Sequence, residues 1–551
     1  MNLMSRSYAE LSSSRSSEEE RTLNSIPRAL AGYRAYTVDQ LKGDFTEGTR
    51  KGLFGELELW SDGRFPEDEP RQFYFLSGGA GLGKSAIAHQ LCTRLDDLER
   101  VGASFFFVRG EEDLSSSRLF FSTLLHQLTL SQPTLRPHII AAVREYLHRG
   151  DQRNLEYASK DLLRKALLEL EASASDHLPV FLVVDGLDEC KERDLLPQLL
   201  RFLLELVRVL PWLHIFAASR PEPHIMAVLM APEARDVVCG RSLDDSLEDL
   251  KGDVKLYLEE TVPRIPSYAA FLCANPDALE RLNRRADGIF IYARIAVRFL
   301  DTYHDHPEEQ FELLFSSGAA PWLTPLDSLY LQVLQSAFPP ADLHQALPAR
   351  RERLLSLLRV ITLQLDSDIL RPSCIVHFGS GMSEKDVVAM VDRLRSVLLI
   401  GKAGEVTPLH ATLSEFLLDH KRCVDSLYHV DAAKGHARFA SACLEAFSIK
   451  NITEYLAHMG SSAVARYVNY ATMHWDDHLR HAEYNDELEI RLRAFAQGDP
   501  AALYQRAQRH ALGGSTSSFN ADPRVRAMVL FLKVSDVPSP AYTSLVFTPL
   551  C

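Results

Sequence analysis

The sequence predicts an α/β domain, a parallel sheet with helices on both faces, followed by mainly helical domains. Between residues 73 and 220, short continuous apolar runs alternate with longer amphipathic segments, the pattern of strands buried between two layers of helices. After about Val237 the apolar runs become rare and helical periodicity takes over. The 551 residues are enough for several cores, so we expect several domains.

Four apolar runs are the predicted strands. They read FYFLS (73–77), ASFFFV (103–108), VFLVVD (180–185) and HIFAAS (214–219). A helix is predicted to begin at Lys84, directly after the first strand, and amphipathic helices are predicted to separate the others.

The predicted winged helix is based on the order of elements in the second half. A helix at 387–400 precedes a hairpin-like stretch at 401–407 and a further helix at 411–420. Breaks that contain proline or glycine, at 316–325, 338–348 and 378–382, suggest where one helical unit ends and the next begins. The predicted domains are a disordered or helical lead-in at 1–45, the α/β domain at 46–240, a helical domain at 241–320, a winged-helix-containing domain at 321–425 and a helical region at 426–551.

Composition excludes several classes of protein. The net charge of −14 argues against nucleic acid as a partner. No apolar run is long enough for a membrane span, and the Ser-rich, charged N-terminus does not read as a signal peptide. The eight cysteines are scattered without metal-ligand spacing, which favours reduced thiols and a cytoplasmic location.

A phosphate-binding loop is predicted between the first strand and its helix. GGAGLGKS fits the pattern G-x-x-x-x-G-K-[ST] in the context that the mechanism needs. Backbone amides and the helix N-terminus would surround phosphates, Lys84 would reach the β and γ oxygens, and Ser85 would ligate Mg²⁺. The predicted nucleotide-binding residues are Gly78, Gly79, Ala80, Gly81, Leu82, Gly83, Lys84 and Ser85.

Acidic residues follow the predicted strand at 180–185. Asp185, at its end, is the candidate Mg²⁺ ligand. Asp188 and Glu189 lie just beyond the strand, where either could orient or deprotonate an attacking water, and the sequence does not choose between them. The alternative is that these two acids only stabilise the N-terminus of the following helix.

Arg220 follows the strand at 214–219 and could meet the γ-phosphate. Its alternative is a surface arginine in a turn. With Asp188 and Glu189 it completes the predicted catalytic group.

The segments GGAGLGKS, VFLVVDGLDEC and IFAASRPEP together resemble the NACHT class of STAND NTPases, most closely fungal, NLR-like proteins with a nephrocystin-like N-terminal core. EGTR at 47–50 and ADGIFIYARIAVRFL at 286–300 resemble the same group, and the likeness covers about residues 46–334. Fungal members commonly carry an effector domain before the core and repeats after it; neither is recognisable here.

The resemblance continues at PLHATLSEFL (408–417), which is similar to the winged-helix segment of NACHT proteins. It implies that His410 contacts the β-phosphate of ADP and holds a closed state, which an imidazole can do as a latch. Without the resemblance, a lone histidine beside a helix is more often a packed structural residue.

The resemblance implies a signalling switch that binds Mg–ATP, hydrolyses it slowly at the β–γ bond, is closed with ADP and open with ATP, and has protein partners or self-associates when open. ATP rather than GTP is expected from the resemblance alone. Two other readings stay open: a turnover ATPase or kinase on the same fold, and a scaffold with a vestigial nucleotide site.

Overall fold

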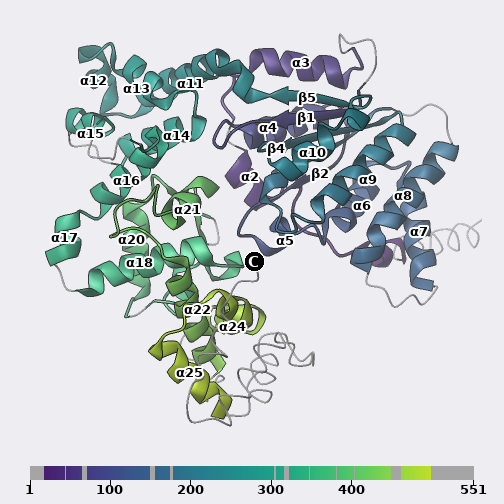
Figure 1. Ribbon diagram of the computed structural model, residues 1–551. Coiled ribbons are helices and arrows are strands. Elements are labelled where there is room, and N and C mark those ends of the chain that lie inside the picture. The colour runs from purple at the N-terminus through teal and green to yellow at the C-terminus, as the bar shows by residue number, and fades with distance from the viewer. Residues whose placement is uncertain are drawn as a thin grey trace, which may run out of the picture. The chain divides into compact units, whose positions relative to one another are not determined.

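The computed structural model forms two compact units, Met1–Arg264 with Leu272–Ala293 and Ile265–Phe271 with Arg294–Cys551 (Figure 1). The structure describes residues 18–43, 45–64, 71–148, 155–173, 178–302, 306–315, 322–345, 348–379, 381–401, 404–447 and 461–497. Residues 1–17 of the predicted lead-in and 498–551 of the predicted C-terminal region lie outside them.

The first unit contains a five-stranded parallel sheet in the order β2-β3-β4-β1-β5. Its strands are β1 (Phe73–Ser77), β2 (Val101–Phe106), β3 (Val180–Asp185), β4 (Leu213–Ser219) and β5 (Val238–Ser242). The predicted α/β fold class is confirmed. Every residue of β1, β3 and β4 is buried, which explains why these strands read as continuous apolar runs.

The edge strand β5 was not predicted. It reads VCGRS, and only its first two residues are buried, so it has no apolar run. Its assignment as a strand depends on pairing along β1, from Phe73 with Val238 to Ser77 with Ser242. An edge strand with one neighbour needs less apolar sequence than a central strand, which explains why the sequence pattern did not reveal it.

Helices cover the sheet in the first unit. The helix α4 packs against β2, β3 and β4, while α6 packs against β2 and α9 against β4. From α3, the indole of Trp60 contacts the rings of Tyr74, Phe181 and His214. Among the described residues, the α-helices between residues 36 and 229 are α2 (Tyr36–Lys42), α3 (Lys51–Ser61), α4 (Lys84–Asp96), α5 (Glu112–Ser115), α6 (Phe120–Ser131), α7 (Arg136–His148), α8 (Leu155–Ser173), α9 (Leu196–Val209) and α10 (Pro223–Leu229).

The segment at 279–300 folds as two helices separated by a sharp turn. Asp287 has a φ of 47° and Gly288 a φ of 79°, and this left-handed pair ends α13 and lets α14 begin two residues later. The helices α11 (Leu247–Thr261) and α13 (Ala278–Ala286) pack against each other. The residues of α12 (Tyr268–Ala274) and of α14 (Phe290–Leu300) are divided between the two units.

The second unit is mainly helical and includes one small antiparallel hairpin, β6 (Leu398–Ile400) with β7 (Val406–Pro408). The predicted helix at 387–400 is wrong at its end: α20 stops at Arg393, and the apolar residues 398–400 pair with β7 instead. Strand pairing satisfies the backbone groups that a continued helix would have used. The remaining helices are α15 (Pro307–Leu313), α16 (Pro325–Ala337), α17 (Pro340–Gln345), α18 (Pro348–Leu363), α19 (Pro372–Ile375), α20 (Glu384–Arg393), α21 (Ala411–Leu418), α22 (Ala432–Phe447), α24 (Ser461–His481) and α25 (Asp486–Gln497).

The order of strands brings the predicted phosphate loop and acids together. β1 lies beside β4, and β4 beside β3, so their carboxyl ends meet at one edge of the sheet. The register aligns Ser77 with Ser219 and Asp185 with Ala218. In such sheets, ligands bind at the carboxyl ends of the strands, and this edge is therefore the candidate site. Among the described residues, no helix is both long and apolar enough to cross a bilayer.

Candidate functional site

The loop between β1 and α4 has the backbone conformation that its glycines permit. Gly81 and Gly83 have φ values of 77° and 87°, in the left-handed region that L side chains rarely adopt. A Cβ on Gly81 would also lie 2.2 Å from the Cγ2 of Ile291. Both glycines are therefore required for this loop, and the second is the N-cap of α4.

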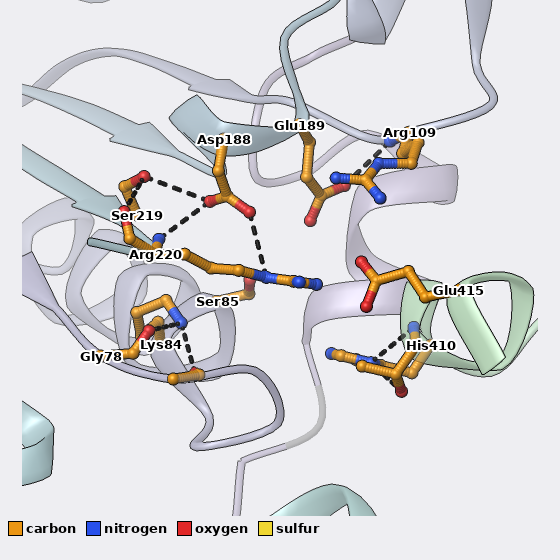
Figure 2. Close-up of polar contacts among 12 residues, drawn as sticks. Gly78, Lys84, Ser85, Arg109, Asp188, Glu189, Ser219, Arg220, His410 and Glu415 are labelled. Atoms are coloured by element: carbon orange, nitrogen blue, oxygen red, sulfur yellow. Dashed lines mark hydrogen bonds and ion pairs between the residues drawn. The ribbon is translucent and has the colours of Figure 1, made fainter. Parts of the chain in front are cut away.

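Lys84 is folded over its own loop. Its Nζ donates to the carbonyl oxygens of Gly78 and Gly79, at 2.7 and 2.8 Å (Figure 2). Burial lowers the pKa of this lysine, while the carboxylates of Asp188 and Asp185 act in the opposite direction. The ammonium thus has neutral oxygens as its nearest partners, and a phosphate would offer charged ones.

One amide of the loop already binds a carboxylate. The amide of Gly79 donates to Asp244 Oδ2 at 3.2 Å, and Asp244 belongs to the turn that follows β5. The loop can therefore hold a negatively charged oxygen, as a phosphate site must. The prediction did not include Asp244, because β5 was missed and nothing in the local sequence marks the acid as a neighbour of the loop.

Arg50 supports the loop from outside. It donates from Nη2 to the carbonyl of Leu82 at 2.5 Å, and its guanidinium lies 5.0 Å from the ring centroid of Phe290. Asp253 accepts from the amide of Arg50 at 3.0 Å and forms an ion pair with its Nε at 3.5 Å. Another contact comes from the amide of Ile291, which donates to Gly81 O at 3.2 Å. The resembling segments EGTR and ADGIFIY thus meet at the phosphate loop.

Asp185 is buried at the end of β3, with 1% of its side chain exposed. Burial raises the pKa of Asp185, and Lys42 and Ser85 oppose this shift. Its Oδ2 accepts no hydrogen bond from any residue that the structure describes, and the ammonium of Lys42 lies 3.5 Å away. A buried carboxylate oxygen whose nearest cationic atom is 3.5 Å away is suited to bind a metal ion at a shorter distance.

Asp188 is held by the end of β4. Its Oδ1 accepts from the hydroxyl of Ser219 at 3.2 Å and from the amide of Arg220 at 3.0 Å, and its Oδ2 lies 3.2 Å from Arg220 Nε (Figure 2). Burial alone would raise the pKa of Asp188, but the Arg220 amide, the guanidinium and Lys84 together lower it. Both oxygens are thus engaged, and Arg220 is held in place through the same carboxylate.

Glu189 points to different partners. Its Oε2 accepts from the amide of Arg109 at 2.8 Å (Figure 2), and its Oε1 lies 3.0 Å from Lys42 Nζ. Lys42 also donates to Ser85 Oγ at 3.3 Å. The structure therefore groups Glu189 with the two predicted magnesium ligands and Asp188 with Arg220, a distinction that the sequence left open. Lys42 was missed because no motif contains it.

His410 belongs to the second unit, where it is the N-cap of α21. Its Nδ1 accepts from the amide of Thr412 at 3.3 Å and lies 2.8 Å from the Thr412 hydroxyl, which in turn contacts Tyr330 at 2.7 Å. Because Nδ1 accepts from the amide, a neutral His410 carries its proton on Nε2. The proposed contact with ADP stays a prediction.

The residues of the first unit fit a magnesium–nucleotide complex. The loop amides and Lys84 are donors for phosphate oxygens, and Ser85 and Asp185 are oxygen ligands of the kind that Mg²⁺ prefers. Within the described part of the chain, no group of three or more His, Cys, Asp and Glu side chains could hold a metal ion. Mg²⁺ in nucleotide sites usually has only one or two carboxylate ligands together with phosphate oxygens and waters.

Comparisons with known proteins agree with this fold. The model of the family described as nephrocystin 3, N-terminal, matches residues 56–220, from α3 to the end of the sheet's central strands. A separate comparison with curated proteins finds no match. The matched span contains the phosphate loop, the acids after β3 and Arg220, and supports a P-loop NTPase domain.

Among solved structures, a Walker-type ATPase of Pyrococcus abyssi has 15% identity and a TM-score of 0.29, covering 68% of this chain and 98% of that chain. Cdc6p from Pyrobaculum aerophilum has 12% identity and a TM-score of 0.31, covering 68% of this chain and 94% of that chain.

Proposed function

We propose that this protein is a nucleotide-dependent switch of the NACHT type, in which the first unit binds Mg–ATP or ADP. The observation that carries the proposal is the meeting of a left-handed, glycine-dependent loop at the end of β1 with a buried, poorly partnered carboxylate, Asp185, at the end of β3. A phosphate donor set and a cation ligand set thus lie at one sheet edge, where nucleotides bind in this fold.

Nucleotide binding would exchange contacts that the chain makes with itself. Lys84 would leave the carbonyls of Gly78 and Gly79 for phosphate oxygens, and the Gly79 amide would leave Asp244. Ser85 and Asp185 would hold Mg²⁺, which would neutralise charge that develops on the phosphates. Each exchange replaces a weaker partner with a more highly charged one, which favours tight retention.

Of the two acids left open by the sequence, we assign the water-orienting role to Glu189. Asp188 contacts the amide and the guanidinium of Arg220 together with the Ser219 hydroxyl, so Asp188 is better placed to position the arginine. Glu189 shares its ammonium partner with Ser85 and Asp185, and therefore lies on the magnesium side of the site. Arg220, held by Asp188, would sense the γ-phosphate.

The switch itself rests on the resemblance. In the proposed cycle, ADP retains a closed form through His410, ATP favours an open form that self-associates or meets protein partners, and slow hydrolysis restores the closed form. The proposal includes the predicted winged helix and a cytoplasmic location. The helix, hairpin and helix formed by α20, β6–β7 and α21 support the first of these.

The test is to purify the protein without added nucleotide, denature it and identify the released nucleotide by chromatography. We expect nearly one ADP per chain, because a latched switch exchanges slowly. Lys84→Ala is the matched variant and should release none. A folded wild-type protein that is empty and turns over ATP rapidly would contradict the switch and favour a turnover ATPase.

A further inference from the structure

The ammonium of Lys42 occupies a position among three oxygens. Its Nζ lies 3.0 Å from Glu189 Oε1, 3.3 Å from Ser85 Oγ and 3.5 Å from Asp185 Oδ2. The side chain is 10% exposed, so water contributes little to its solvation. Two of these three oxygens, those of Ser85 and Asp185, are the ones that the nucleotide site would offer to Mg²⁺.

The lengths of these three contacts suit an ammonium, and a divalent cation would bind the same oxygens more closely. Distances of 3.0 to 3.5 Å are those of ion pairs and hydrogen bonds, whereas Mg²⁺ binds oxygen at about 2.1 Å. One positive charge faces the carboxylates of Asp185 and Glu189. A divalent ion would balance both charges and satisfy Asp185 Oδ2 directly.

The segment that carries Lys42 is weakly anchored. Lys42 is the last residue of α2, a helix of seven residues without a side-chain N-cap, in which Val38 is the one buried residue. Such a short helix has little stability of its own and depends on its contacts. Besides the lysine, these include packing against α4 and the pair of Asp39 with His89 at 3.4 Å. Losing the lysine contacts would therefore loosen α2.

We propose that Lys42 and Mg²⁺ are alternative occupants of one cation position, so that Mg²⁺ expels the lysine and releases α2 from the nucleotide site. The inference rests on the proposed function, since the metal enters with a nucleotide. The attachment of α2, which precedes the phosphate loop in the chain, would then depend on whether the bound nucleotide carries Mg²⁺. Without the metal, the lysine supplies one positive charge to the buried Asp185 and the half-buried Glu189.

The first test measures Mn²⁺ binding to the ADP-loaded protein by electron paramagnetic resonance of the free ion. Lys42→Met removes the charge and keeps the length of the side chain, and Lys51→Met, at an exposed lysine that begins α3, is the control. Removal of the competing charge should tighten Mn²⁺ binding by about tenfold in Lys42→Met. Lys51→Met should match the wild type. Unchanged or weaker binding in a folded, ADP-loaded Lys42→Met would overturn the inference.

A second measurement uses the wild type alone and does not depend on a variant that folds. Amide hydrogen exchange of residues 36–43 should become faster by about tenfold when Mg²⁺ is added to the ADP-loaded protein, because α2 loses its lysine contacts. Unchanged or slower exchange would overturn the inference. Failure of the wild type to bind ADP, with or without metal, would instead contradict the proposed function, so the two failures are distinguishable.

Discussion

The phosphate-loop edge of the first unit and the His410 cap of the second use polar side chains in different ways. At the sheet edge, Lys84 holds its own loop carbonyls and Lys42 holds acids that also suit a metal, and both arrangements can be exchanged for a ligand. At the cap, His410 satisfies the amide of Thr412, a need that exists in every state of the helix. Contacts that a ligand can replace, such as those of Lys84 and Lys42, therefore indicate a binding site more clearly than the N-cap contact of His410 does.

The largest expected effect comes from Lys84→Ala. We expect ADP affinity to fall at least about 100-fold, since a charged donor to the phosphates is lost. Stability without nucleotide should change little, because the lysine contacts only neutral loop carbonyls. Fluorescence titration measures the affinity, with Lys51→Ala as the control. Equal affinity in Lys84→Ala and wild type would remove the phosphate role of this lysine.

Glu189→Gln separates the two acids by chemistry. We expect ATP hydrolysis to slow by about 100-fold while ADP stays bound, because general-base or water-orienting groups contribute this much to rate. Single-turnover release of phosphate gives the rate. If Asp188→Asn slowed hydrolysis more than Glu189→Gln while Arg220 kept its place, the assignment of the two acids would be reversed.

Asp188→Asn is expected to lower the stability of the first unit. The carboxylate accepts from Ser219 and Arg220 and pairs with the guanidinium, so its loss should cost about 2 kcal/mol of unfolding free energy at pH 7. The pKa of Asp188 is lowered in the fold, so its contribution is present above the unfolded value near 3.8 and is lost as pH falls through the lower folded value. Urea unfolding from pH 7 to 3 should show the two proteins converging in acid; a pH-independent difference would show that the charge is not responsible.

The smallest effect is expected at the cap. His410→Ala should destabilise the second unit by about 1 kcal/mol, as loss of an N-cap does. His410→Asn restores a capping side chain without an imidazole and should recover that loss. Thermal unfolding measures both variants, and the ADP off-rate is measured beside it. A faster off-rate in both variants would support the latch, whereas a normal off-rate in His410→Asn would leave His410 only its role as a cap.

Much of the site was predictable from local pattern. The central strands are buried on both faces and so read as apolar runs, and the loop glycines must adopt backbone conformations that other residues avoid. The edge strand β5 was missed, because it has no apolar run and is recognised as a strand only through its pairing with β1.

The sequence by itself determined the α/β class, the phosphate loop and the acids after β3, because each depends on neighbours along the chain: periodicity, glycine spacing and the end of a strand. Only the tertiary structure decided which acid lies beside the predicted magnesium ligands, that Arg50 supports the loop and that Lys42 lies among Ser85, Asp185 and Glu189. These contacts join residues 32 to 147 positions apart, and their energies depend on burial and distance, which no local pattern encodes.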